Sequence, residues 1–132
     1  MAAFPVTALR SVELLVPDLD AAERFYVETG GLAPAARDAG RVWLRATGDD
    51  HHVLWLEQGA AAIRSVTFRR HDAAALDAAL AGAAGEGAAL LAAPAPLEEP
   101  GGGIGATLRS PEGFVLRLVA GDERRAADAP AA

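Results

Sequence analysis

The stretch IRSV at residues 63–66 nearly repeats LRSV at residues 9–12, and this pair of segments indicates the fold. Each segment belongs to a short run rich in apolar and β-branched residues, which is typical of a strand. The first run ends at Pro17, because proline cannot donate to a strand ladder. The repeat therefore predicts two similar halves, each of which begins with a strand.

A helix is predicted after each of these strands. In the first half, Asp18 or Asp20 can cap a helix that carries Phe25 and Tyr26 on one face and stops at a pair of glycines. In the second half, the alanine-rich residues 72–87 predict a helix that again ends at glycine. Both halves thus continue from a strand into a helix.

Strand-like stretches follow each helix and are separated by turn signals rich in Gly, Asp and Pro. They are residues 32–38, 41–48 and 51–59 in the first half and 88–94, 103–110 and 113–121 in the second. The closing stretches LRATGDDHHVLWL and LRSPEGFVLRL align and set Trp55 opposite Arg117.

The order of elements predicts an α+β fold made of two βαβββ modules. We expect one domain over residues 1–121, with module one at 8–58 and module two at 62–121. The glycine-rich LEEPGGG is expected to be a flexible connection within module two. Residues 122–132 are expected to form a flexible tail.

Composition excludes several kinds of function. The chain has 132 residues, 52% of them hydrophobic and 23% charged, which is typical of a globular domain. A net charge of -6 argues against nucleic acid as a partner. No cysteine is present, so there is no thiolate nucleophile. No apolar run is long enough to span a membrane, and we expect a cytoplasmic protein without a membrane partner.

The pattern resembles the vicinal oxygen chelate superfamily, which includes glyoxalase I, bleomycin resistance proteins and extradiol dioxygenases. SVELLVPDLDAAERFY is similar to its opening strand and helix, and SPEGFVLRLV is similar to its closing hairpin. The run LRATGDDHHVLWL resembles the non-catalytic module of extradiol dioxygenases in particular. The resemblance implies the glyoxalase/bleomycin resistance/dioxygenase fold, in which the mixed sheets of two modules curl around a cavity. In the enzymes of the superfamily, it also implies a divalent metal held in that cavity.

The resemblance also places the metal ligands of those enzymes on this sequence, at Ser11, Trp55, Ser65 and Arg117. Neutral hydroxyls are poor ligands for a divalent ion, an indole offers only a donor, and arginine stays protonated. We therefore expect no metal and no cofactor.

Strand alternation predicts which side chains face the cavity instead. The expected ligand-binding residues mix an indole, carboxylates, guanidinium groups and hydroxyls, a pattern that suits a small organic molecule. They are Ser11, Glu13, Trp55, Glu57, Ser65, Thr67, Arg69 and Arg117. In a purely structural interpretation, Glu13 pairs with Arg117 or Arg69, and Trp55 only fills the core. Trp43 is expected in the core or in a dimer interface.

The histidines are expected to have structural or surface roles, because neighbours in a strand, such as His51 and His52, point to opposite faces. A metal site built from Glu13, Glu57 and one histidine is the alternative. No catalytic residue is assigned, although either glutamate would act as a general base if burial raised its pKa.

Three functions remain open on the sequence alone. The first is a metal-independent protein that binds a small organic ligand, for example to sequester an antibiotic, and that forms a homodimer. The second is a dioxygenase-like, lyase-like or isomerase-like enzyme with unconventional ligands or a carboxylate base. The third is a degenerate module that pairs with a catalytic partner.

Overall fold

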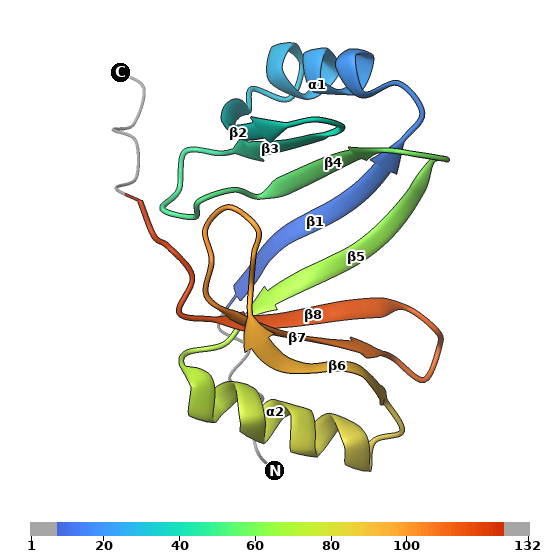
Figure 1. Cartoon of the computed structure of the whole chain (residues 1–132), viewed down its shortest axis with the longest axis vertical. Coiled ribbons are helices and arrows are strands. Elements are labelled where there is room, and N and C mark those ends of the chain that lie inside the picture. Colours follow the sequence, from blue (N-terminus) through green and yellow to red (C-terminus); the bar gives the residue numbers. More distant parts are fainter. Residues whose placement is uncertain (1–7, 126–132) are drawn as a thin grey trace.

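Strand β1 (Ala8–Val16) lies near the middle of one mixed sheet of eight strands. The computed structural model describes residues 8–125, and the sheet order is β2-β3-β4-β1-β5-β8-β7-β6. Figure 1 shows the sheet curling between two helices that lie at opposite ends of the molecule. The predicted α+β class with two βαβββ modules is confirmed, and the two modules share one continuous sheet.

The first half contains helix α1 and three further strands. Helix α1 (Leu19–Glu28) is capped by Asp18, whose Oδ1 accepts a hydrogen bond from the Ala21 N–H at 3.1 Å. The strands are β2 (Ala33–Asp38), β3 (Arg41–Arg45) and β4 (Leu54–Gln58). Large aliphatic side chains of the strands pack against α1, and Val42, Leu44 and Leu56 are fully buried.

The second half repeats this order with smaller side chains. It contains β5 (Ala62–Arg69), helix α2 (Ala73–Gly85), β6 (Ala89–Pro96), β7 (Ile104–Arg109) and β8 (Val115–Ala120). Helix α2 is capped by Asp72, which accepts from the Ala75 N–H at 2.8 Å. Its packing cluster is built on Leu76, Ala106 and Ala120.

The repeated segments lie on the two strands where the halves meet. Strand β1 pairs with β5 in antiparallel fashion, so that Glu13 is opposite Ser65 and Ser11 is opposite Thr67. On its other side β1 pairs with β4 in parallel, which places Trp55 beside Glu13. Strand β5 pairs with β8 in parallel, with Arg117 beside Thr67. Residues from both halves therefore converge on one face of the central strands.

The region around the paired histidines differs from the sequence expectation. Strand β4 begins at Leu54, so His51 and His52 lie in the loop that precedes it. Both side chains are buried, and their Nδ1 atoms are 3.0 Å apart. The prediction that a strand turns them to opposite faces was wrong, because strand alternation does not operate in a loop.

The start of the expected tail contacts the domain. Asp122 is buried, the Glu123 N–H donates to the Gly101 carbonyl at 2.8 Å, and the Arg125 N–H donates to the Asp49 carbonyl at 2.6 Å. Residues 126–132 of that tail lie outside the described residues. Within residues 8–125, neither helix is both long and apolar enough to cross a bilayer.

Candidate functional site

Glu13 is the centre of a polar cluster on the inner face of the sheet. Its side chain is 1% exposed, and its carboxylate accepts hydrogen bonds from three hydroxyls. Ser11 donates to Oε2 at 2.7 Å, while Ser65 and Thr67 donate to Oε1 at 2.6 Å each. Short bonds of this kind are typical of a hydroxyl that donates to an ionised carboxylate. The carboxylate charge is thus held by hydroxyls from both halves.

Arg117 closes this cluster from strand β8. Its Nε donates to the Thr67 Oγ1 at 2.9 Å and lies 3.7 Å from the Glu13 Oε1. Its two terminal nitrogens donate to Glu99 at 2.5 and 3.0 Å. Burial opposes the charge on Arg117, but the bonded Glu99 carboxylate outweighs it and raises the pKa of the guanidinium. Arg117 is therefore a fixed cation at the edge of the cluster.

Glu99 comes from the glycine-rich connection between β6 and β7, which rises toward β1 and β4 in Figure 1. Its Oε2 accepts from Arg10 at 3.0 Å, so Glu99 joins Arg10 to Arg117. Arg10 reaches this inner face because the pairing of β1 with β5 is irregular between Leu9 and Ser11. Its guanidinium donates to the Ser11 hydroxyl at 3.1 and 3.2 Å.

His52 extends the network from the loop before β4. Its Nε2 lies 3.2 Å from the Nη2 of Arg10 and its Nδ1 lies 3.0 Å from the Nδ1 of His51. Burial, followed by the charge of Arg10, lowers the pKa of His52 to about 2. The ring is therefore neutral at ordinary pH. Because Nε2 faces an obligate donor, the proton belongs on Nδ1, which donates to His51.

A cavity of about 220 Å³ opens beside Glu13 and is bounded by Trp55 and Arg117. The Trp55 ring packs against Trp43 with 5.4 Å between centroids. Guanidinium carbons of Arg64 and Arg117 lie 5.4 and 5.6 Å from the centroid of the same ring. Neither indole N–H has a hydrogen-bond partner within residues 8–125. The wall thus combines an aromatic surface, two cations and an unpaired donor.

Several solved structures have a fold similar to that of this chain. A Mn(II)-bound glyoxalase from Novosphingobium aromaticivorans matches with a TM-score of 0.91 and 31% sequence identity, covering 96% of this chain and 42% of that chain. The chain therefore has the fold of the vicinal oxygen chelate superfamily. This confirms the resemblance that the opening strand and closing hairpin indicated.

Homoprotocatechuate 2,3-dioxygenases give further matches within the vicinal oxygen chelate superfamily. The enzyme from Arthrobacter globiformis has a TM-score of 0.75 and 27% identity, covering 88% of this chain and 36% of that chain. A variant of the enzyme from Brevibacterium fuscum has a TM-score of 0.75 and 26% identity over 88% and 33% of the two chains. This chain thus spans less than half the length of each of these relatives. No protein-family model matches the sequence, and the comparison with curated proteins found no match.

The metal positions that the vicinal oxygen chelate resemblance implies hold Ser11, Trp55, Ser65 and Arg117. Both serine hydroxyls donate to Glu13, and Arg117 brings a positive charge. Hydroxyls, an indole and a guanidinium do not form a ligand set for a divalent ion. These residues therefore do not fit the metal of the superfamily.

The alternative metal site from glutamates and a histidine does not form in the described part of the chain. No group of three or more His, Asp or Glu side chains within residues 8–125 is arranged to hold a metal ion. Glu57 bonds to Arg64 at 2.8 Å near the rim, while His52 is engaged with Arg10.

The structure brings most of the predicted site residues together. Glu13, Trp55, Ser65 and Arg117 line the cavity, and Ser11 and Thr67 bond to Glu13. The expected pair between Glu13 and Arg117 is confirmed as one contact of this cluster.

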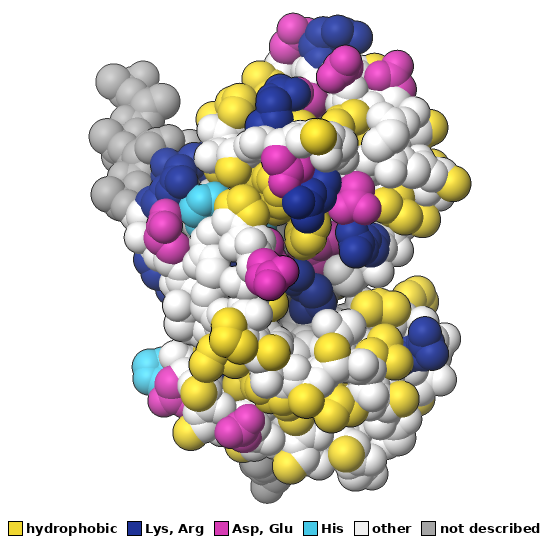
Figure 2. Space-filling model, in the orientation of Figure 1, with side chains coloured by type: hydrophobic (Ala, Val, Ile, Leu, Met, Phe, Trp, Pro, Cys, Tyr) yellow, Lys and Arg dark blue, Asp and Glu magenta, His cyan; other side chains and the backbone are white. Residues whose placement is uncertain are grey.

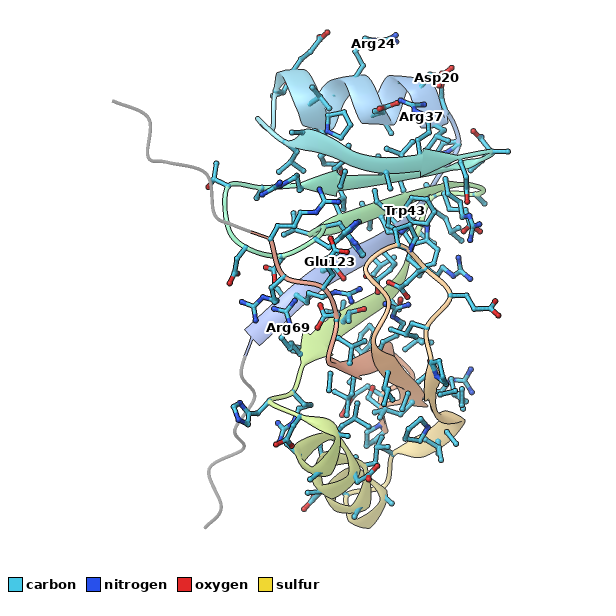
Figure 3. All side chains as sticks on the ribbon, turned by 60° about the vertical axis from the view of Figure 1, so that its left-hand side comes forward. Asp20, Arg24, Arg37, Trp43, Arg69 and Glu123 are labelled. Carbon is cyan, nitrogen blue, oxygen red and sulfur yellow. The ribbon has the colours of Figure 1, made fainter. Side chains whose placement is uncertain are left out.

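The other two predicted site residues neither line this cavity nor bond to Glu13. Glu57 lines a more open hollow beyond Trp55 and Arg64. Arg69 bonds instead to Asp122 at 2.6 and 3.0 Å and to Asp50 at 2.5 Å. Figure 3 shows Arg69 well away from Trp43, which packs against the cavity wall.

The sequence analysis did not identify Arg10, Glu99 and His52 as members of the buried polar network around Glu13. Regular alternation would place Arg10 on the face opposite Ser11, but the pairing of β1 with β5 is irregular between Leu9 and Ser11, and both side chains join the network. Glu99 lies in a connection without periodicity. The one available signal was a pair of acidic residues within an otherwise glycine-rich loop.

Proposed function

We propose that the chain binds a small organic molecule in the cavity beside Glu13 and Trp55 without using a metal. The supporting observation is a cavity with one aromatic wall over a polar floor whose hydrogen bonds are already made. Such a floor keeps its shape when the cavity is empty, which lowers the cost of ordering on binding. Antibiotic sequestration is one function that this geometry would serve.

The charged side chains around the cavity indicate which kind of ligand it can bind. The overall charge of -6 suggests a cationic compound, but the cavity wall carries Arg64 and Arg117. The only carboxylate among the lining residues, Glu13, is already bonded by hydroxyls from Ser11, Ser65 and Thr67. A planar molecule with hydrogen-bond acceptors fits better, since it can stack on Trp55 and face guanidinium groups.

The enzyme interpretation has less support from the same contacts. A general base needs a carboxylate oxygen within reach of a substrate proton. Both oxygens of Glu13 already accept hydrogen bonds from hydroxyl groups, and Glu57 bonds to Arg64. A protein that binds its ligand without transforming it is therefore the better proposal.

The test is tryptophan fluorescence of a Trp43→Phe variant, which leaves Trp55 as the only tryptophan. A panel of planar aromatic compounds is titrated, and at least one is expected to quench Trp55 saturably. Val115 lines the cavity, so Val115→Phe in the same background should weaken that binding at least about 10-fold. Ile63→Phe is the matched control, because Ile63 is exposed and does not line the cavity.

Two results would overturn the proposal. The first is the absence of saturable quenching by every compound. The second is equal affinity in the Val115→Phe variant and its control, since a ligand in this cavity must contact the added ring.

A homodimer and a cytoplasmic location are also proposed. Strand β6 is exposed along its whole length at the edge of the sheet, and Leu90 and Leu91 are exposed on it. An uncovered apolar edge strand is a common pairing surface. The relatives' chains are more than twice as long as the matched region, which favours a partner of similar size. Sedimentation velocity of the full chain checks the dimer, and a monomer at high micromolar concentration would contradict it.

A further inference from the structure

A second pocket lies between helix α2 and the sheet of the second half, on the face opposite the Glu13 cluster. It has a volume of about 310 Å³. The strands contribute Phe68, Leu116 and Leu118, and the facing side of the helix contributes Ala79 and Ala83. The pocket exists because alanine side chains are too short to fill the space between the helix and the strands.

The pocket contains a buried cation. Arg70 is the residue that follows β5, and its side chain lines the pocket together with Phe68. Arg70 is 4% exposed, and its buried Nε has no hydrogen-bond partner within residues 8–125. A buried guanidinium nitrogen without a partner is unfavourable, because nothing replaces the water it has lost.

The other charged residue of the lining does not neutralise Arg70. Glu86 follows the C-terminal end of α2, whereas Arg70 precedes the N-terminal end. Within residues 8–125, however, the two side chains form neither a hydrogen bond nor a salt bridge with each other. The carboxylate of Glu86 therefore does not occupy the place of an anion at Arg70.

We propose that this pocket binds a small apolar carboxylate, with the carboxylate on Arg70 and the apolar tail between α2 and the strands. A guanidinium binds a carboxylate with two parallel hydrogen bonds, and the interaction is strongest where water is excluded. The volume is at the lower end for ligand pockets, so a tail of medium length fits best. In Figure 2, apolar side chains outnumber charged ones on the surface over α2 and β6.

The test compares octanoate with octanol by calorimetric titration of the full chain. The two probes share the tail and differ in charge, so octanoate should bind saturably and at least about 10-fold more tightly. Arg70→Met removes the charge but keeps a long side chain. This variant should abolish the preference for octanoate while it retains weak binding of both probes.

A second variant tests the pocket independently of Arg70. Ala83→Leu fills the space between the helix and the strands and should abolish binding of both probes. Ala81→Leu is the matched control, because Ala81 is exposed on the same helix and does not line the pocket. Circular dichroism establishes that each variant is folded.

Three results would overturn the inference. They are the absence of saturable octanoate binding, equal affinity for octanoate and octanol in the wild type, and unchanged octanoate affinity in a folded Ala83→Leu variant. Because this pocket and the cavity beside Trp55 lie on opposite faces of the sheet, neither test depends on the outcome of the other.

Discussion

The two halves of the sheet have the same order of elements but fill the space under their helices differently. Under α1, Tyr26 and Val27 pack against a cluster of buried valine and leucine side chains. Under α2, alanines face the strands and leave a pocket of about 310 Å³. The comparison shows that backbone topology does not decide whether a module has a solid core or a binding pocket. The volume of a few side chains on the helix decides it.

We expect the largest loss of stability from a substitution at the boundary between the halves, where hydroxyls from both halves bond to the carboxylate of Glu13. Replacing Glu13 by leucine leaves three buried hydroxyls without their acceptor and removes a charge partner of Arg117. We expect this variant to lose about 3–5 kcal/mol of unfolding free energy, measured by urea denaturation.

Glu57→Leu is the control for that variant. Glu57 lies in the same half but bonds to Arg64 near the surface, so its loss should cost at most about 1 kcal/mol. Equal losses in the two variants would show that the hydroxyls do not depend on Glu13.

A reciprocal pair of substitutions tests the difference in helix packing directly. Ala22 packs against the solid core under α1, while Ala83 lines the pocket under α2. Ala22→Leu should lose about 1–3 kcal/mol through overpacking. Ala83→Leu should gain about 1 kcal/mol by burying apolar surface without displacing neighbours. Thermal unfolding of both variants measures the effect, and a loss of the same size in each would contradict the comparison.

We expect the smallest effect, on the pH dependence of stability, from a difference between the loops that precede the last strand of each half. The sequence alignment sets His52 opposite Phe114, yet His52 is 1% exposed and Phe114 is 69% exposed. The pKa of His52 is lowered to about 2, mainly by burial and then by Arg10, so the folded state binds fewer protons than the unfolded state. Its contribution to stability is therefore complete above pH about 6.5 and declines as the pH falls toward about 2.

Between pH 7 and pH 5 this loss should reach about 1–2 kcal/mol in the wild type. His52→Gln keeps an acceptor for Arg10 and should reduce the slope of unfolding free energy against pH. His71→Gln is the control at an exposed position. Identical slopes in the wild type and in His52→Gln would contradict a buried neutral imidazole.

Much of the fold could be predicted because it depends on local patterns. Alternation along β1 placed Ser11 and Glu13 on the inner face, and the repeat placed Ser65 and Thr67 there as well. Because side chains alternate regularly between the two faces of a strand, one assigned residue predicts the face of every other residue in that strand.

The remaining features depend on irregular backbone or on distant packing. Arg10 turns inward at a bulge, Glu99 arrives on a loop, and His52 belongs to a segment that only resembles a strand. The pocket beside Arg70 arises from missing volume in an alanine-rich helix. Periodicity identifies the face that α2 turns to the sheet but not the gap beneath it.

The hydroxyls around Glu13 also restrict how the halves can join. If β5 slipped by one residue along β1, Ser65 and Thr67 would turn to the opposite face, away from the carboxylate. The carboxylate of Glu13 would then be buried without the hydroxyl donors of Ser65 and Thr67. A slipped pairing of β1 with β5 is therefore less stable than the native one. The hydroxyls of one half and the carboxylate of the other thus fix the register in which β1 and β5 pair.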